Sequence, residues 1–424
     1  MEPIKMSLSK KDIVFSGALL DKGDIKKADF LIPDYDNACI TRIMPSIRDS
    51  LLKQKEAFHS AEAEIAAASD ALVSFSGEDD RPVPEKDLVS ESIGMSERYV
   101  LLVLDGLGYE QLTERKEIAP TLAGMNTKCI SSVAPTTTST ALTSITTGMT
   151  PARHGVLGYR MKVLDNDILN VLRWSTKDRL GEHGLDPAKL QPHLPFKGCD
   201  VSVVSRKEFD ATGFSSLHLR GTPLHGWRVP SNLIVTAKNL LKEGKKFLYL
   251  YYDGIDKVAH EYGFGEYYDQ ELSFVDALVE SILNCLPGDT TLVVTADHGQ
   301  VEVKKPLLKL PTSIADKVTL LSGEGRFRWL HAAEGTAEEV KRISLESFGD
   351  VAVVATLDEL VDAGLFGGQL SAEYRSRLGD VAVIPTEPLA FFDPYDTGDL
   401  KLIARHGGMT SAELFVPLLT HVSQ

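Results

Sequence analysis

Three runs of mostly apolar residues along the chain end in an aspartate. They are RYVLLVLDG (residues 98–106), KFLYLYYDG (246–254) and TTLVVTADHG (290–299). A continuous apolar run is typical of a strand that is buried on both faces, as in the centre of a parallel sheet. We therefore predict three core strands, each of which delivers acidic residues to the loop at its carboxyl end.

The segment between the second and third runs has a helical pattern instead. Within residues 267–286, apolar residues recur every three or four positions, as on one face of a helix, at Leu272, Val275, Leu278 and Ile282. Strands that alternate with helices predict an α/β fold, with a doubly wound, mostly parallel sheet flanked by helices. Ligands of such sheets bind beyond the carboxyl ends of the strands, so one site there would collect all three acidic turns.

The first part of the chain has a different composition. Residues 1–97 are predicted to form an N-terminal extension, with a short strand and then a helix across residues 40–73. Residues 74–97 are acidic and interrupted by Gly and Pro, which is typical of a linker or a long exposed loop. The catalytic core is therefore expected to begin at residue 98.

This core is predicted to be split by an insertion. Residues 98–303 form its first part, and residues 304–395 have the pattern of a small α/β cap subdomain without a cluster of metal-binding residue types. Residues 396–424 return to the core with RHGG, predicted to be an exposed His-Gly-Gly loop, followed by a strand. A cap in this position would lie over the site and influence the choice of substrate.

Composition and charge restrict the possible partners. The chain has 424 residues, of which 43% are apolar, and a formal charge of −15. Nucleic-acid scaffolds are bound through clustered Lys and Arg, which this balance disfavours, but bound cations can still attract a small phosphorylated substrate. Because the sequence has neither a secretory signal nor an apolar run long enough for a membrane span, we expect a cytoplasmic protein without membrane contact.

Six carboxylate and imidazole residues follow predicted strands or lie in nearby loops: Asp105, Asp256, His260, Asp297, His298 and His406. Asp256 and His260 lie four residues apart, so one helical turn can direct both at a single ion. Taken singly, each of the six has an ordinary alternative as a helix cap, a surface residue or a loop histidine. Together they favour zinc, with manganese as second choice, and two such ions can hold the attacking and leaving oxygens of a displacement at phosphorus.

A threonine-rich segment supplies candidates for a nucleophile. In VAPTTTSTALTSITTG, the residues Thr136, Thr137 and Thr138 precede a predicted helix of small side chains. A hydroxyl at the start of a helix faces free N–H groups, which favour a phosphate group. The ordinary alternative is a threonine-rich capping turn, and the residues themselves do not choose among the three hydroxyls.

Five motifs together resemble a known family. In order, LLVLDG, PTTTSTALTSITTGMTPARHG, DGIDKVAHEYG, TADHG and RHGG are similar to the motifs of the alkaline phosphatase superfamily, specifically its type I nucleotide pyrophosphatase/phosphodiesterase branch. The resemblance covers residues 98–424 and implies an alkaline phosphatase-like fold. It implies that Thr138, ten residues before Gly148 (148 − 10 = 138), is the nucleophile. It further implies zinc at two positions, one held by Asp256, His260 and His406, the other by Asp105, Asp297, His298 and the Thr138 oxygen.

The same resemblance implies a reaction. It points to a metal-dependent hydrolase of phosphodiester or nucleotide pyrophosphate bonds, which acts through a phospho-threonine intermediate on a small phosphorylated substrate such as a nucleotide. A phosphomonoesterase or phosphomutase of the same superfamily is the alternative, because it would use the same metals. A sulfatase is disfavoured, since PTTTST lacks the CxPxR-like context of a modified nucleophile. A binding protein that kept only the fold is disfavoured by the complete set of ligands.

Cationic side chains outside these motifs are candidates for contacts to an anionic leaving group. Arg326, Arg328 and His331 lie in the predicted cap, and Arg160 and Arg173 follow the threonine-rich segment. The other interpretation of each is an ordinary surface ion pair.

Overall fold

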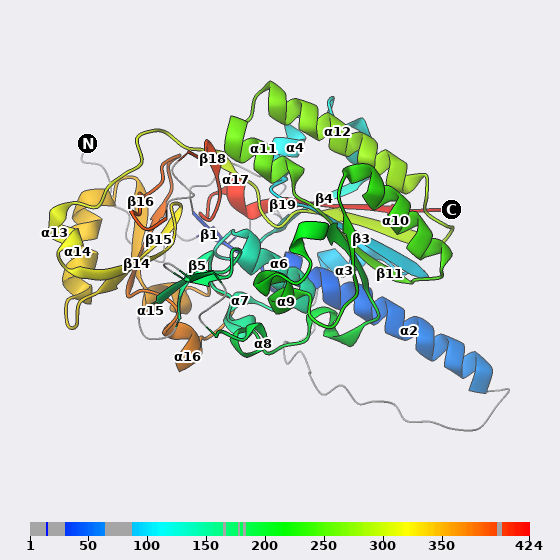
Figure 1. Cartoon of the computed structure of the whole chain (residues 1–424), viewed down its shortest axis with the longest axis horizontal. Coiled ribbons are helices and arrows are strands. Elements are labelled where there is room, and N and C mark those ends of the chain that lie inside the picture. Colours follow the sequence, from blue (N-terminus) through cyan, green and yellow to red (C-terminus); the bar gives the residue numbers. More distant parts are fainter. Residues whose placement is uncertain are drawn as a thin grey trace.

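The computed structural model describes residues 14–15, 30–63, 87–163, 167–176, 179–180, 184–396 and 401–424. A seven-stranded sheet with the order β10-β9-β11-β3-β12-β19-β4 runs through its centre (Figure 1). The strands are β3 (Arg98–Leu104), β4 (Asn126–Ser131), β9 (Ser202–Arg206), β10 (Leu224–Trp227), β11 (Phe247–Tyr252), β12 (Thr290–Thr295) and β19 (Phe415–Val422). Strand β19 runs in the opposite direction to the other six strands of this sheet.

The three strands predicted from the apolar runs are β3, β11 and β12, and they lie side by side. Leu104 of β3 pairs with Tyr252 of β11, and Val103 pairs with Thr295 of β12, all in parallel. Every residue of β11 and β12 is buried, as a central strand requires. The register therefore brings the three acidic turns to one edge of the sheet.

Helices cover both faces of this sheet, so the predicted doubly wound α/β fold is confirmed. In Figure 1, one face carries α4 (Tyr109–Thr113), α10 (Pro230–Lys242), α11 (Gly254–Tyr262) and α12 (Glu266–Leu283), and the other carries α2 (Ile43–Ala63), α3 (Leu88–Ile93), α6 (Thr138–Thr147) and α9 (Gly213–His218). In α12 the apolar residues at spacings of three and four are all buried, as predicted.

Residues after β12 build a second, antiparallel sheet with the order β14-β15-β17-β16. Its strands are β14 (Val318–Glu324), β15 (Phe327–Ala332), β16 (Ala352–Thr356) and β17 (Val381–Pro385), and α14 (Ala337–Phe348) packs on it around a separate small core. In Figure 1 this sheet, yellow to orange, lies to the left of the central sheet. The ends of the proposed insertion at residues 304 and 395 stay a prediction.

The remaining elements are short. They are β1 (Val14–Phe15), β2 (Leu31–Ile32), η1 (Ile40–Arg42), α5 (Pro120–Gly124), α7 (Pro151–His154), β5 (Arg160–Val163), β6 (Asp167–Asn170), β7 (Ser175–Thr176), β8 (Arg179–Leu180), α8 (Pro187–Leu190), η2 (Pro195–Gly198), η3 (Lys207–Phe209), β13 (Val301–Glu302), α13 (Thr312–Ala315), α15 (Leu357–Asp362), α16 (Ala372–Arg375), β18 (Ala404–Arg405) and α17 (Ser411–Leu414). Strands β13 and β18 pair with each other, although in the sequence one precedes and the other follows the strands of the second sheet. None of the described helices combines the length and hydropathy that a membrane crossing requires.

The N-terminal extension differs from its prediction in one segment. Helix α2 occupies much of the predicted helix 40–73, while residues 64–73 and the first part of the predicted acidic linker, up to residue 86, lie outside the described residues. The rest of the predicted linker is not an exposed loop throughout, because it contains α3. The Asp87 side chain caps α3 by accepting from the Ser90 N–H, and Val89 and Ile93 are buried.

Two arginines and one aspartate form a buried ionic contact between the second sheet and the segment after α6. Asp393 Oδ2 accepts from Arg328 Nη1 of β15 at 3.1 Å and from Arg160 Nη1 of β5. All three side chains are buried. Arg160 and Arg328 are therefore neither surface ion pairs nor open to an anionic leaving group, contrary to both interpretations of the sequence.

We expect Asp393→Asn to lower the free energy of unfolding by about 3–5 kcal/mol, because it removes the buried carboxylate that Arg160 and Arg328 share. Urea unfolding followed by circular dichroism measures the change. The matched control is Glu346→Gln in the i,i+4 pair Arg342–Glu346, whose side chains are 59% and 54% exposed and whose loss should cost less than about 1 kcal/mol. Equal effects of the two substitutions would contradict this interpretation.

Candidate metal centre

The seven residues predicted for the site come from five places in the chain and meet at the carboxyl edge of the central sheet. Asp105 follows β3, Asp297 and His298 follow β12, Asp256 and His260 lie on α11, His406 follows β18, and Thr138 is the first residue of α6. The structure thus brings together groups that are separated by up to 301 positions (406 − 105 = 301).

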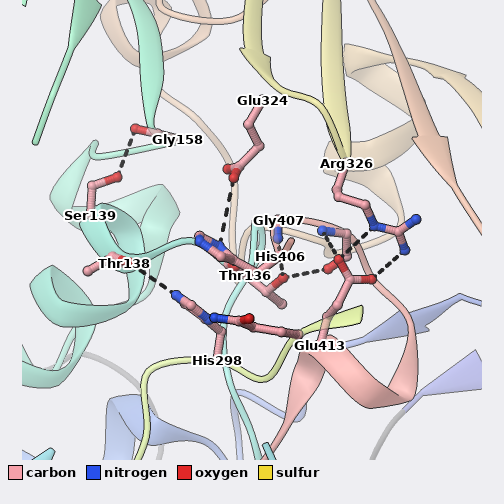
Figure 2. A network of polar contacts seen from close by, with 12 residues as sticks. Thr136, Thr138, Ser139, Gly158, His298, Glu324, Arg326, His406, Gly407 and Glu413 are labelled. Atoms are coloured by element: carbon pink, nitrogen blue, oxygen red, sulfur yellow. Dashed lines mark hydrogen bonds and ion pairs between the residues drawn. The ribbon is translucent and has the colours of Figure 1, made fainter. Parts of the chain in front are cut away.

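One group surrounds the His298 imidazole. Its Nε2 atom lies 3.6 Å from Asp105 Oδ1 and 3.4 Å from Asp297 Oδ2. The Thr138 hydroxyl lies 3.1 Å from the same nitrogen (Figure 2). These four residues are the set that the resemblance assigns to one metal.

A second group surrounds the Asp256 carboxylate. Its Oδ1 atom lies 3.3 Å from His260 Nε2 and 4.0 Å from His406 Nε2. The His298 ring stacks on the His406 ring with 3.7 Å between centroids, and ligand atoms of Asp256, His298 and His406 all lie within 4.8 Å of one another. His298 therefore lies beside both groups, whereas the resemblance assigns it to one.

Backbone carbonyls orient all three imidazoles. The Nδ1 atoms of His260, His298 and His406 lie 2.8, 3.1 and 3.0 Å from the carbonyl oxygens of Ala404, Gly299 and Thr136, respectively. Since a carbonyl oxygen can only accept, each Nδ1 carries the proton and each Nε2 presents a lone pair to the centre. This arrangement is typical of histidines that bind a metal through Nε2.

The two innermost carboxylates each have one oxygen held by a donor and one without. Asp297 Oδ1 accepts from the N–H groups of Gly106 and His298 at 3.1 and 3.0 Å, and Asp105 Oδ2 accepts from the Tyr251 hydroxyl. Asp105 Oδ1 and Asp297 Oδ2 are buried and have no hydrogen-bond partner among the residues that the structure describes. A buried carboxylate oxygen without a donor is costly, and a cation between these two oxygens and His298 Nε2 would compensate both, so the residues present fit a metal.

Burial and, after it, the crowding of like groups shift the pKa values of Asp105 and His406 at this centre. Burial, followed by the neighbouring carboxylates of Asp297 and Asp256, raises the pKa of Asp105 well above its ordinary value. The pKa of His406 is lowered well below its ordinary value, first by burial and then by the neighbouring imidazoles of His298 and His260. The raised pKa of Asp105 indicates that the protein alone supplies too little positive charge to stabilise the ionised carboxylate. The lowered pKa of His406 indicates that its imidazole is held neutral.

The three threonine hydroxyls have different surroundings. Thr136 Oγ1 accepts from the Gly407 N–H at 3.0 Å and donates to Gly408 O at 2.7 Å. Thr137 Oγ1 is buried without a partner, and only Thr138 among the three lines the neighbouring cavities. The geometry thus favours Thr138, the residue that the resemblance selects.

Two cavities of about 230 and 210 Å³ meet at the site, and Thr138, Leu172 and Asp256 line both. The first, here called the charged cavity, is also lined by Arg173, His260, Glu324, Asp396, Arg405 and His406. The second, here called the aromatic cavity, is lined mainly by apolar and aromatic side chains, among them Leu142, Phe209, Phe214, His218, Tyr249 and Tyr251, and also by Asp105, Asp253 and Lys257. A substrate at Thr138 would therefore have room on two sides, with different chemistry on each.

The other cationic candidates fall into two classes. Arg326 is fully buried and paired with Glu413, so it is not a surface ion pair, and His331 is a buried residue whose Nε2 lies 2.8 Å from Ser322 Oγ. Arg173 is exposed and lines the charged cavity, so among these candidates it is the one placed to meet an anionic group.

Sequence reasoning missed the residues that hold the ligands. Tyr251 donates to Asp105, Gln300 Nε2 donates to Asp256 Oδ1, and Glu413 organises the His406 loop. Tyr251 lies in KFLYLYYDG, whose apolar pattern predicts the strand β11. This pattern does not indicate that the Tyr251 hydroxyl reaches the carboxylate of Asp105, which follows β3, the neighbouring strand in the sheet. The prediction that the His-Gly-Gly loop is exposed was wrong, because Gly407 and Gly408 are buried.

Comparisons with known proteins show which sequences and folds are similar to this chain. Residues 99–409 match the family model described as type I phosphodiesterase / nucleotide pyrophosphatase. Among solved structures, an inactive variant of murine ectonucleotide pyrophosphatase / phosphodiesterase 5 in complex with AMP has a TM-score of 0.57 at 14% identity, covering 77% of this chain and 88% of that one. Phosphonoacetate hydrolase from Sinorhizobium meliloti, in complex with phosphonoformate, has a TM-score of 0.56 at 18% identity, covering 78% and 91%. No curated protein matches the chain.

We expect Asp105→Asn to stabilise the metal-free protein while removing most of the stabilisation that added zinc or manganese gives. Without a cation the substitution removes a carboxyl whose ionisation is opposed by burial and by the neighbouring carboxylates, a gain on the order of 1–3 kcal/mol; with a cation it removes a ligand. Thermal unfolding in chelator and in excess metal measures both effects.

Asp276→Asn is the control for this prediction. Asp276 is also a buried carboxylate, but it accepts from the N–H groups of Thr121 and Leu122 at 3.1 and 2.8 Å, away from the centre. Its replacement should lower stability equally with and without metal. A loss of stability in metal-free Asp105→Asn would count against the fit to a cation.

Proposed function

This chain belongs to the type I phosphodiesterase / nucleotide pyrophosphatase family, and we propose that it cleaves phosphodiester or nucleotide pyrophosphate bonds through a phospho-threonine intermediate at a two-metal site. As a member of the family it is a metal-dependent hydrolase of phosphate esters. The observation that carries the finer proposal is the position of the Thr138 hydroxyl, 3.1 Å from His298 Nε2 and at the junction of the two cavities.

The proposed ligand sets follow the motifs. Asp256, His260 and His406 would hold one divalent cation, and Asp105, Asp297, His298 and the Thr138 oxygen would hold the other. Imidazole nitrogens with carboxylates favour zinc, and manganese is the second choice. Bound cations of this kind lower the pKa of a coordinated hydroxyl and neutralise charge on phosphate oxygens. The orientation of all three Nε2 atoms toward the centre supports this assignment.

Helix α6 aligns Thr138 with the phosphate. Thr138 is its first residue, and the first N–H of the helix with an intrahelical acceptor belongs to Ala141, which donates to Thr137 O. The N–H groups of Thr138, Ser139 and Thr140 in the first turn of the helix are therefore available to phosphate oxygens, whereas the Thr137 N–H donates to Pro135 O. The Thr138 hydroxyl loses its proton to solvent, Oγ1 forms a bond to phosphorus, and the bond from phosphorus to the leaving oxygen breaks; the leaving oxygen then takes up a proton from solvent. Water next forms a bond to phosphorus and loses a proton, the bond from phosphorus to Oγ1 breaks, and Oγ1 is reprotonated as the Thr138 hydroxyl.

The two cavities favour a substrate with two substituents on phosphorus. A diester can place one in each cavity, whereas a monoester leaves one cavity empty. The aromatic cavity suits a planar group, and His218 adds a polar contact there. His218 Nδ1 lies 2.7 Å from Phe214 O, and burial lowers the pKa of His218 to about 4, so a neutral ring presents Nε2 as an acceptor. We propose a nucleotide-like substituent with an N–H donor for this cavity.

Thr138→Ala should reduce turnover by at least about 10³-fold, because the attacking oxygen is removed, while metal content stays near that of the wild type. Steady-state kinetics and elemental analysis of the same samples test this. Thr137→Ala is the matched control, since its hydroxyl is buried and has no hydrogen-bond partner, and it should change turnover little. Near-normal activity of Thr138→Ala would exclude the mechanism.

A screen of substrates with zinc and with manganese tests the reaction class. We expect kcat/KM for bis-p-nitrophenyl phosphate and for dinucleotides to exceed that for p-nitrophenyl phosphate by at least about 10-fold, since a filled hydrophobic cavity can contribute that much discrimination. Faster turnover of the monoester would favour the phosphomonoesterase or phosphomutase alternative.

A further inference from the structure

The His406–Gly408 loop is fixed to the segment that carries the proposed nucleophile. His406 Nδ1 donates to Thr136 O at 3.0 Å, and the Gly407 N–H donates to Thr136 Oγ1 at 3.0 Å. The same hydroxyl donates to Gly408 O at 2.7 Å. These bonds set the His406 ring relative to Thr138, as Figure 2 shows.

Glu413 supports the other side of the loop. Its fully buried side chain accepts from the Gly408 N–H through Oε1 at 2.9 Å. Its main-chain oxygen accepts from the Gly299 N–H at 2.8 Å, directly after His298. One residue therefore contacts the loops that carry two of the proposed ligands, His406 and His298.

Arg326 holds the Glu413 carboxylate in place. Nε donates to Oε1 at 2.9 Å and Nη2 donates to Oε2 at 2.6 Å, a two-pronged contact that fixes the plane of the carboxylate (Figure 2). The remaining N–H groups donate to the carbonyl oxygens of Glu387, Leu389 and Pro385. All five donors of the guanidinium are thereby engaged, so Arg326 is not available to bind a substrate anion although it lines the charged cavity.

Arg326 and Glu413 lie next to different sheets, Arg326 in a turn of the second sheet and Glu413 in α17, directly before a strand of the central sheet. Arg326 lies in the two-residue turn between β14 and β15, where Glu324 pairs with Phe327, and Glu413 lies at the entrance to β19 of the central sheet. The tip of the hairpin from the second sheet is thus in contact with Glu413, which is hydrogen-bonded to the loops that carry His406 and His298.

Two neighbouring carboxylates explain the two glycines of the loop: Glu324 on the hairpin lies against Gly407, and Glu413 lies against Gly408. A Cβ on Gly407 would lie 2.4 Å from Glu324 Cδ, and a Cβ on Gly408 would lie 2.6 Å from Glu413 Oε2. Gly407 also has φ +108, which side chains rarely adopt. The loop has no side chains at these positions because two carboxylates lie against it.

We propose that Arg326 and Glu413 are positioning residues, through which the hairpin of the second sheet sets the placement of His406 and His298 and hence the affinity of the metal centre. This inference rests on the proposed function, in which both histidines bind metal. Groups that orient metal ligands commonly change affinity by about 10–100-fold when they are replaced.

The test is Arg326→Lys, which keeps the charge but cannot span both carboxylate oxygens and the three carbonyls. Zinc titrated into metal-stripped protein and followed by calorimetry should bind about 10–100-fold more weakly than to the wild type. At limiting zinc kcat should fall in parallel, KM for substrate should change little, and excess zinc should restore most of kcat. Glu413→Gln should weaken zinc binding in the same way, and it replaces Arg326→Lys if that variant does not fold.

Arg328→Lys is the matched control, because Arg328 is equally buried on the same hairpin but pairs with Asp393 rather than with Glu413. It should lower the melting temperature while leaving zinc affinity within about 2-fold, well below the loss expected for an orienting group. Wild-type affinity in Arg326→Lys, or equal losses in both arginine variants, would overturn the proposal. Failure of the wild type itself to bind zinc or manganese would instead refute the proposed function.

Discussion

Two buried carboxylates, each with one oxygen to which no described protein group donates, create a need for positive charge at the carboxyl edge of the central sheet. The strand order β11-β3-β12 brings Asp105 and Asp297 to the same edge of the sheet, beside the lone pair of His298. The protein fixes the other oxygen of each with the Tyr251 hydroxyl or with main-chain N–H groups. The donors thus orient the carboxylates without neutralising them, so that a cation is the natural complement of the fold.

The second sheet contributes to this centre through charge rather than through apolar packing alone. Its hairpin carries Arg326, which pairs with Glu413 beside the His406 loop. It also carries Arg328, which pairs with Asp393, and the same carboxylate pairs with Arg160. Buried ion pairs lose much of their Coulombic gain to desolvation, but they restrict geometry strongly, because a misplaced partner leaves a charge uncompensated. Such contacts suit a place where ligand positions matter more than net stability.

The sequence predicts the parts of the molecule that depend on local pattern. Apolar runs predicted β3, β11 and β12, helical spacing predicted the buried face of α12, and the motifs selected residues that the fold brings together. Residues such as Glu413 and Tyr251 were missed because their roles depend on partners 87 and 146 positions away, at Arg326 and Asp105, which no local pattern indicates. Helix α3 was missed for a related reason: its acidic, glycine-containing surroundings are typical of a loop, and only packing of Val89 and Ile93 on the core makes it a helix.

Because the whole chain is negatively charged, a bound metal would also affect how the protein attracts an anionic substrate. A protein with a formal charge of −15 repels phosphate anions at long range, and ionised carboxylates of Asp105, Asp256 and Asp297 would add to that repulsion at the proposed position of the phosphate. Cations bound at this centre would reverse the local potential over a distance comparable to the Debye length of about 8 Å at physiological ionic strength. In the proposed mechanism, substrate affinity and metal occupancy are therefore coupled by electrostatics, so a substitution that displaces the metal ligands is expected to weaken substrate binding even where no contact to the substrate is lost.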